Sequence, residues 1–131
     1  MAKAIHSMIR VFDLDRSLSF YQQALDLNIA ERLDFDDFTL VYLRNDENDF
    51  ELELTHNHNQ TEPYSHGTGY GHLAVCVDNA AASQEKLTKL GYQPAEVKEF
   101  HRDNQLLARF FFVTDPDGYK IEFLEKHGRY Q

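Results

Sequence analysis

The feature that most constrains the fold is an internal repeat. One stretch, "AIHSMIRVFDLDRSLSFYQQALDLNIAERL", begins at Ala4, and a second, "GHLAVCVDNAAASQEKLTKLGYQPAEV", begins at Gly71. Both open with a histidine on an alternating apolar run, pass through an acidic turn, and continue with apolar residues at spacings of three or four. This shared order predicts a strand, a turn and a helix in each half of the chain.

The helix signals are similar in the two halves. Asp13 and Asp78 each stand just before the helical pattern and are predicted N-caps, because an aspartate side chain accepts hydrogen bonds from the first free backbone amides. The predicted apolar faces comprise Leu14, Leu18, Tyr21 and Leu25 in the first helix, and Leu87 and Leu90 in the second.

Each half continues with strand-like runs. These are "FTLVYL" and "FELELT" in the first half and "ARFFFVT" and "YKIEFLE" in the second, where "DPDG" predicts a turn between them. The predicted fold is therefore α+β, with a βαβββ module used twice. A chain of 131 residues is the usual size of one domain. We therefore expect a single domain over residues 1–131, with module one at about 1–60 and module two at about 68–127.

Charge and composition exclude several classes of function. Lys and Arg number 13 against 22 Asp and Glu, which gives a net charge of −9, and there is no basic run to neutralise a nucleic-acid backbone. No apolar stretch approaches the ~20 residues that a membrane span requires. The single cysteine, Cys76, excludes an internal disulfide and a cysteine-built zinc site. We expect a cytoplasmic protein whose metal, if it binds one, is held by histidines and carboxylates.

The repeat extends to residues that bind metals. His6 and His72 stand on the first strand of each half, and Glu53 and Glu122 stand on the last. A glutamate flanked by apolar residues in a strand is costly unless a charged group meets it. Four such residues at mirrored positions predict a metal site, although each taken singly is more typical of a structural residue.

A second histidine pair, His56 and His58, follows Glu53 closely. Side chains alternate along a strand, so these histidines follow Leu54 onto the face opposite Glu53. We therefore predict that the pair belongs to a solvated or partly packed strand end and not to the metal site.

In the stretches around the two mirrored histidines and the two mirrored glutamates, the chain resembles the glyoxalase I family, the lactoylglutathione lyases of the vicinal oxygen chelate superfamily. The matching stretches, in order, are "HSMIRVFDLDRSLSFYQQAL", "ELTHN", "GTGYGHLAVCVDNA" and "DPDGYKIEFLE". The resemblance implies paired βαβββ modules, a homodimer, and one divalent metal ion in each active site at the subunit interface. The implied ligands are His6 and Glu53 from one chain and His72 and Glu122 from its partner. The short form of the chain resembles the bacterial type, which favours nickel or cobalt over zinc, and two imidazoles with two carboxylates suit all three ions.

The resemblance also implies a reaction. The substrate is the hemithioacetal of methylglyoxal and glutathione, and the product is S-lactoylglutathione, formed by glutamate proton transfer through a metal-stabilised enediolate. Glu122 matches the family's principal base, and Glu53 is its symmetric partner.

Two further residues are candidates for binding the substrate. Arg10 lies on the His6 face, about 13 Å along the strand, within reach of a glutathione carboxylate. The alternative role for Arg10 is a surface ion pair. Asn57 matches an amide of the family.

The chain departs from the family in three places. Over residues 96–109 the family has a glycine-rich, lysine-containing loop that covers the thiol. This segment of the chain instead contains "EFHRDNQLLAR". His58 stands where a tryptophan is common, and Asp26 stands where a helix-ending glycine is usual. The altered loop favours an alternative: another enzyme of the superfamily, such as an epimerase or a thiol transferase. A drug-binding homologue without activity is a further alternative, but such a protein has no need of four metal ligands.

Overall fold

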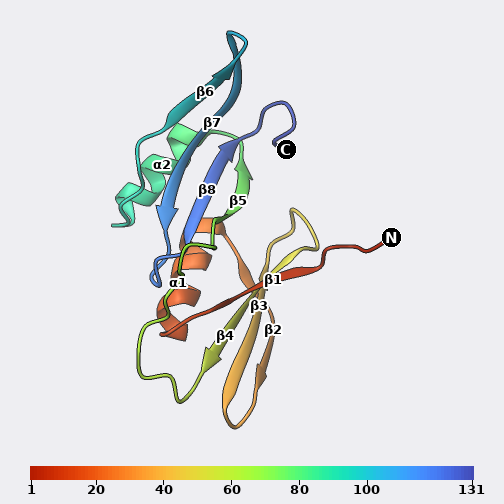
Figure 1. The fold of residues 1–131 in the computed structure, drawn as a ribbon, viewed down its shortest axis with the longest axis vertical. Coiled ribbons are helices and arrows are strands. Elements are labelled where there is room, and N and C mark those ends of the chain that lie inside the picture. Colours follow the sequence, from red (N-terminus) through yellow and green to blue (C-terminus); the bar gives the residue numbers. More distant parts are fainter. The chain divides into compact units, whose positions relative to one another are not determined.

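Residues 1–131, all described by the computed structural model, repeat one order of elements twice. Two units of similar length result, Met1–Ser65 and His66–Gln131 (Figure 1). Each consists of a strand, a helix and three further strands, and each contains one four-stranded sheet. The predicted α+β fold of paired βαβββ modules is confirmed.

The sheet of the first unit pairs strands from opposite ends of residues 1–65. Its elements are β1 (His6–Arg10), α1 (Leu14–Leu25), β2 (Asn28–Asp34), β3 (Phe38–Arg44) and β4 (Glu51–Asn57). The strand order is β1-β4-β3-β2, with β1 parallel to β4 and the other pairs antiparallel. The first strand of the unit thus lies directly beside the last.

The second unit has the same topology. Its elements are β5 (His72–Val77), α2 (Ala80–Lys89), β6 (Lys98–Arg102), β7 (Gln105–Thr114) and β8 (Lys120–Glu125). The strand order is β5-β8-β7-β6, and again only the first pair is parallel. The helix α2 contacts β7 and β8. Neither α1 nor α2 is long and apolar enough to span a bilayer.

Alternation along the strands separates an apolar face of each sheet from a mixed face. On the apolar face of the first sheet, Val41 and Leu54 are fully buried, and on that of the second, Ile121 and Phe123 are almost fully buried. Burying such side chains contributes roughly 1.5–3 kcal/mol each. Because side chains alternate with a period of two, the glutamate beside Leu54 and the glutamate between Ile121 and Phe123 point to the opposite face.

The first helix begins and ends as its sequence requires. The Asp13 side chain accepts a hydrogen bond from the Arg16 amide at 3.1 Å, which confirms the predicted N-cap. Of the predicted face, Leu14, Tyr21 and Leu25 are buried and Leu18 is half-buried. The helix ends at Asp26, which adopts the left-handed conformation with φ of 55° that usually favours glycine.

Two details predicted for the second helix are wrong. The N-cap is Asn79 and not Asp78, because the Asn79 side chain accepts the Ala82 amide at 2.9 Å and the helix begins one residue later. Leu87 is buried, but Leu90 is 42% exposed. Leu90 is the C-cap residue, so it lies beyond the last residue that the helical period brings to the core.

The segment predicted as a loop over residues 96–109 is a β-hairpin. Strand β6 pairs with an extended β7, and the connection consists of Asp103 and Asn104 with φ of 53° and 61°. Positive φ at both central residues is typical of the two-residue turn whose twist matches that of paired strands. The asparagine and aspartate tolerate this conformation, which is why a segment without glycine still turns tightly.

The predicted turn between β7 and β8 is present. The Asp115 carboxylate accepts hydrogen bonds from the backbone amides of Asp117 and Tyr119, both at 2.9 Å. Gly118 has a φ of +87°, which a residue with a side chain rarely adopts. The turn determines where β8 starts and therefore on which face Glu122 lies.

Candidate metal centre

In the first unit, the parallel pairing of β1 with β4 brings His6 and Glu53 together. Met8 is the register partner of Glu53, and His6 lies two residues before Met8 on the same face of the strand. His6 Nε2 lies 3.7 Å from Glu53 Oε2. Glu53 is 8% exposed, which makes it one of the few buried charged residues in the chain.

Tyr42 of β3 completes this first group. It is the register partner of Glu53 on the other side, and its hydroxyl donates a hydrogen bond to Glu53 Oε1 at 2.7 Å. This hydrogen bond, together with burial and the charge of Glu53, raises the pKa of the Tyr42 phenol. The rings of His6 and Tyr42 pack edge to face, with centroids 5.7 Å apart. One oxygen of Glu53 is therefore held by Tyr42 while the other faces His6.

Sequence reasoning did not identify Tyr42. The signal was present in "FTLVYL", where the period of two places Tyr42 opposite Val41 and Leu43 and hence on the Glu53 face. What the pattern does not contain is the register between β3 and β4, which decides that the hydroxyl reaches Glu53.

In the second unit, β5 and β8 bring His72 and Glu122 together in the same way. Ala74 is the register partner of Glu122, as Met8 is of Glu53. His72 Nε2 lies 2.8 Å from Glu122 Oε2. The His72 ring packs edge to face against Phe112, at a centroid distance of 5.2 Å.

Both pairs have donor atoms suited to a divalent ion. Two atoms that bind one ion at ~2.1 Å in neighbouring positions lie about 3 Å apart. The 2.8 Å separation of His72 and Glu122 fits this value, and the 3.7 Å separation of His6 and Glu53 suits a wider angle at the ion. No group of three or more His, Cys, Asp or Glu side chains that could hold an ion occurs in the chain. Each unit thus presents two of the four predicted ligands.

The second histidine pair lies where alternation predicts. His56 Nδ1 lies 3.4 Å from the Val11 carbonyl oxygen. His58 uses both ring nitrogens, with Nε2 at 2.8 Å from the Thr39 hydroxyl and Nδ1 at 3.0 Å from the Asp36 carbonyl oxygen. These contacts hold the strand end.

The two candidate substrate residues lie in the first unit. Arg10 is exposed at the end of β1, and its Cα partner is Thr55. The Asn57 amide donates a hydrogen bond to the Tyr64 hydroxyl at 3.0 Å. Tyr64 was not predicted as a partner of Asn57, and its hydroxyl holds the nitrogen end of the amide.

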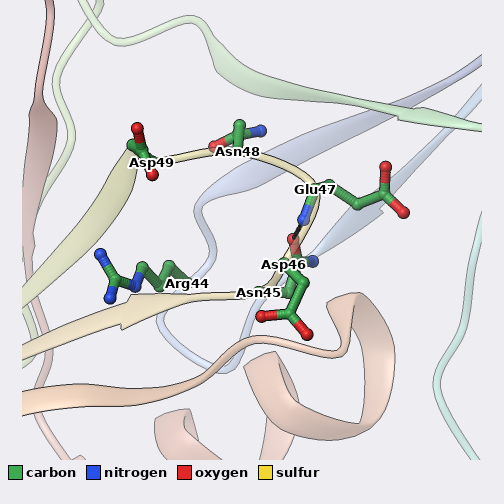
Figure 2. A pocket seen from close by; sticks show the side chains of 6 residues that line it. All are labelled: Arg44, Asn45, Asp46, Glu47, Asn48 and Asp49. Carbon is green, nitrogen blue, oxygen red and sulfur yellow. Dashed lines mark hydrogen bonds between the residues drawn. The ribbon is translucent and has the colours of Figure 1, made fainter.

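The first unit also contains a surface hollow near the connection between β3 and β4. Figure 2 shows its lining side chains, which come from the end of β3 and from the connection to β4. The lining residues are Arg44, Asn45, Asp46, Glu47, Asn48 and Asp49. The Asn45 side chain accepts the Glu47 backbone amide at 3.0 Å, which holds the turn. The hollow is acidic and made by one turn, and it contains none of the predicted site residues.

Paired βαβββ modules with a histidine and a glutamate on the mixed face of each sheet define a class of protein, the vicinal oxygen chelate proteins. The Glyoxalase/Bleomycin resistance protein/Dioxygenase superfamily matches residues 3–123, and the chain belongs to this superfamily.

Individual relatives show which members of the superfamily this chain resembles. The chain is 41% identical to the lactoylglutathione lyase of Neisseria meningitidis over 129 residues, which cover 95% of this chain and 91% of the relative. It is 39% identical to the lactoylglutathione lyase of Haemophilus influenzae, over 92% of this chain and 90% of the relative. Among solved structures, the trypanothione-dependent glyoxalase I of Leishmania major superposes with a TM-score of 0.76 at 33% identity, over 95% of this chain and 87% of that one. The predicted resemblance to glyoxalase I is confirmed.

Proposed function

We propose that the protein is a glyoxalase I that converts the hemithioacetal of methylglyoxal and glutathione into S-lactoylglutathione. The observation that carries this proposal is the pair of histidine–glutamate contacts, His6 with Glu53 and His72 with Glu122, at matching strand positions. They occur in a chain that is 41% identical to a lactoylglutathione lyase over nearly its whole length. A binding protein without catalytic activity has no need of two such pairs.

The four side chains are proposed to hold one divalent ion per site. His6 and Glu53 of one protomer would meet His72 and Glu122 of the partner subunit in a homodimer. Two nitrogen and two oxygen ligands leave open positions of an octahedron for substrate oxygens and suit nickel, cobalt and zinc alike. The resemblance of this short chain to the bacterial type favours nickel or cobalt. When bound, the ion supplies Lewis-acid stabilisation of negative charge on those oxygens.

The protein side chains then have distinct roles. Glu122 removes the proton from the carbon of the hemithioacetal and returns it to the neighbouring carbon, since a carboxylate within hydrogen-bond reach can act as base and then as acid. Glu53 lies at the symmetric position. Arg10 attracts a carboxylate of the thiol, which an otherwise acidic protein would repel. Asn57 contributes hydrogen bonds to the same portion of the substrate.

The test of the proposal is thioester formation from methylglyoxal and glutathione. Activity is measured on the purified protein, after treatment with a chelator, and after separate addition of nickel, cobalt or zinc. We expect loss with the chelator, recovery with nickel or cobalt, and loss of most of kcat in Glu122→Gln, which keeps the shape of the side chain but cannot accept the proton. Tight metal binding without activity in any metal form would contradict the proposal.

A second candidate concerns the thiol. The β6–β7 hairpin occupies the segment in which the family has a glycine-rich, lysine-containing loop, and a relative at 33% identity is described as trypanothione-dependent. Comparing kcat/KM for glutathione, for trypanothione and for a thiol without the γ-glutamyl group tests this point. A preference for another thiol, or activity only as an epimerase, would support a related enzyme of the superfamily.

Location and other partners are also proposals. A net charge of −9 supports a protein that does not bind nucleic acid. Dependence on a reduced thiol substrate and the presence of an exposed free Cys76 support a cytoplasmic location.

A further inference from the structure

The two halves of the candidate centre differ chemically at one register position. Tyr42 on β3 is the Cα partner of Glu53, and Phe112 on β7 is the Cα partner of Glu122. Each ring packs edge to face against the histidine of its own unit, at 5.7 Å for Tyr42 and 5.2 Å for Phe112. The two aromatic rings therefore stand in equivalent places, and the difference between them is one hydroxyl group.

That hydroxyl acts on only one of the two glutamates. Tyr42 donates to Glu53 Oε1 at 2.7 Å, a charge-assisted bond in a partly buried position, whereas a phenylalanine ring has no donor to offer Glu122. A glutamate side chain has three rotatable bonds, so a bond to one oxygen removes much of its freedom and determines where the other oxygen points. In Glu53 that other oxygen faces His6.

We propose that Tyr42 is a positioning residue that makes the two glutamates unequal. It holds Glu53 as a fixed metal ligand, and it leaves Glu122, opposite Phe112, as the carboxylate able to turn toward the substrate and transfer the proton. This inference rests on the proposed function for the proton-transfer role of Glu122, but the part that concerns metal binding by Glu53 stands apart from activity.

The first experiment follows cobalt binding, which needs no substrate. Tyr42→Phe removes one oxygen atom and reproduces in the first unit the arrangement of the second. The metal-free wild type and variant are titrated with cobalt in competition with a chelator, and the visible absorption of the bound ion is recorded. Loss of a hydrogen bond to a ligand typically weakens metal binding ~10-fold or more, so we expect this loss and a changed absorption spectrum. Tyr92→Phe, which removes a hydroxyl from outside both sheets, is the matched control and should change neither.

The second experiment moves the hydroxyl to the other half. Phe112→Tyr offers a donor to Glu122, and we expect a lower kcat with little change in KM. The double variant with Tyr42→Phe exchanges the two environments. In wild type, Glu122→Gln should reduce kcat far more than Glu53→Gln, and in the double variant this difference should shrink or reverse. Circular dichroism and thermal unfolding check that each variant is folded.

The outcomes separate the inference from the proposed function. Unchanged cobalt affinity and spectrum in Tyr42→Phe, in an active enzyme, would overturn the inference and leave the function intact. A changed affinity and spectrum in a protein without isomerase activity would support the positioning of Glu53 and contradict the function. Failure of the wild type to bind cobalt would overturn the inference, and activity with added nickel or zinc would then decide the function. If Phe112→Tyr does not fold, the cobalt result for Tyr42→Phe alone decides.

Discussion

Arg109 of β7 donates a hydrogen bond from Nη1 to Oε1 of Glu125 of β8, at 2.6 Å. The other oxygen of Glu125 accepts the backbone amide of Ala80, the first residue of α2, at 3.0 Å. One carboxylate therefore joins the sheet of the second unit to the start of its helix, where free amides and the helix dipole favour negative charge. The Ala80 amide, and then Arg109, lower the pKa of Glu125 below its usual value.

This contact predicts a loss of stability in acid. Because the pKa of Glu125 is lower in the folded than in the unfolded chain, its contribution is present above the usual glutamate pKa and is lost as the pH falls through the lowered value. Glu125→Gln should therefore lower the unfolding temperature by a few degrees near neutral pH, and the difference from wild type should shrink in acid. Thermal unfolding from about pH 7 to about pH 3 measures this.

Glu85→Gln provides the control, because Glu85 is an exposed residue of α2 whose ion pair with Lys89 lies within one helix. An exposed pair of this kind contributes little to stability. A constant difference between Glu125→Gln and wild type over the whole pH range would contradict the assignment.

The left-handed residue that ends α1 predicts a stabilising substitution. Asp26 has a φ of 55°, and a residue with a Cβ in this region is disfavoured by about 1 kcal/mol relative to glycine. Asp26→Gly should therefore raise the free energy of unfolding by about 1 kcal/mol in denaturant titration.

The second unit supplies the reverse substitution. Gly91 follows α2 with a φ of +91°, and a Cβ there would meet no heavy atom within 4 Å. Gly91→Ala tests backbone conformation without a steric clash and should destabilise by about 1 kcal/mol or more. Equal stability of both variants and wild type would show that neither position governs the helix ends.

Metal content distinguishes the predicted ligands from the neighbouring histidines. His6→Ala and His72→Ala should each lose tightly bound metal, because a site with three of its four protein ligands binds far more weakly. His56→Ala should retain it, since His56 contacts the Val11 carbonyl at the strand end. Dialysis against nickel followed by elemental analysis measures the ratio of metal to protein. A loss in His56→Ala as large as that in His72→Ala would contradict the assignment.

Arg10 should act on binding more than on chemistry. If its guanidinium attracts a carboxylate of the thiol, Arg10→Ala should raise KM roughly 10-fold with a small change in kcat, as expected for one charge-assisted contact. Arg32→Ala is the control, because Arg32 is exposed on β2 and pairs with Asp34 at 3.1 Å. Steady-state kinetics at low and high salt measure both variants. The same increase in KM for both would indicate a general effect of charge.

Much of the fold and of the candidate centre follows from local pattern. The repeat of a histidine strand, a helix and further strands predicts two βαβββ modules, and the period of two assigns Glu53 and Glu122 to one face and His56 to the other. These features depend on residues close in sequence, whose side-chain directions are determined by the backbone geometry of a strand. The helix start at Asn79 and the hairpin at Asp103 and Asn104 were not predicted, because neighbouring polar residues offer competing caps and turns.

The sequence by itself determined the repeat, most of the helices and strands, and the residue types able to hold a metal ion. The tertiary structure decided which of these side chains meet: that His72 lies 2.8 Å from Glu122, and that Tyr42 bonds to Glu53 while Phe112 faces Glu122. The physical reason is strand register. Pairing residues far apart in the chain places two side chains opposite each other, and a shift of one residue would turn each to the other face of the sheet.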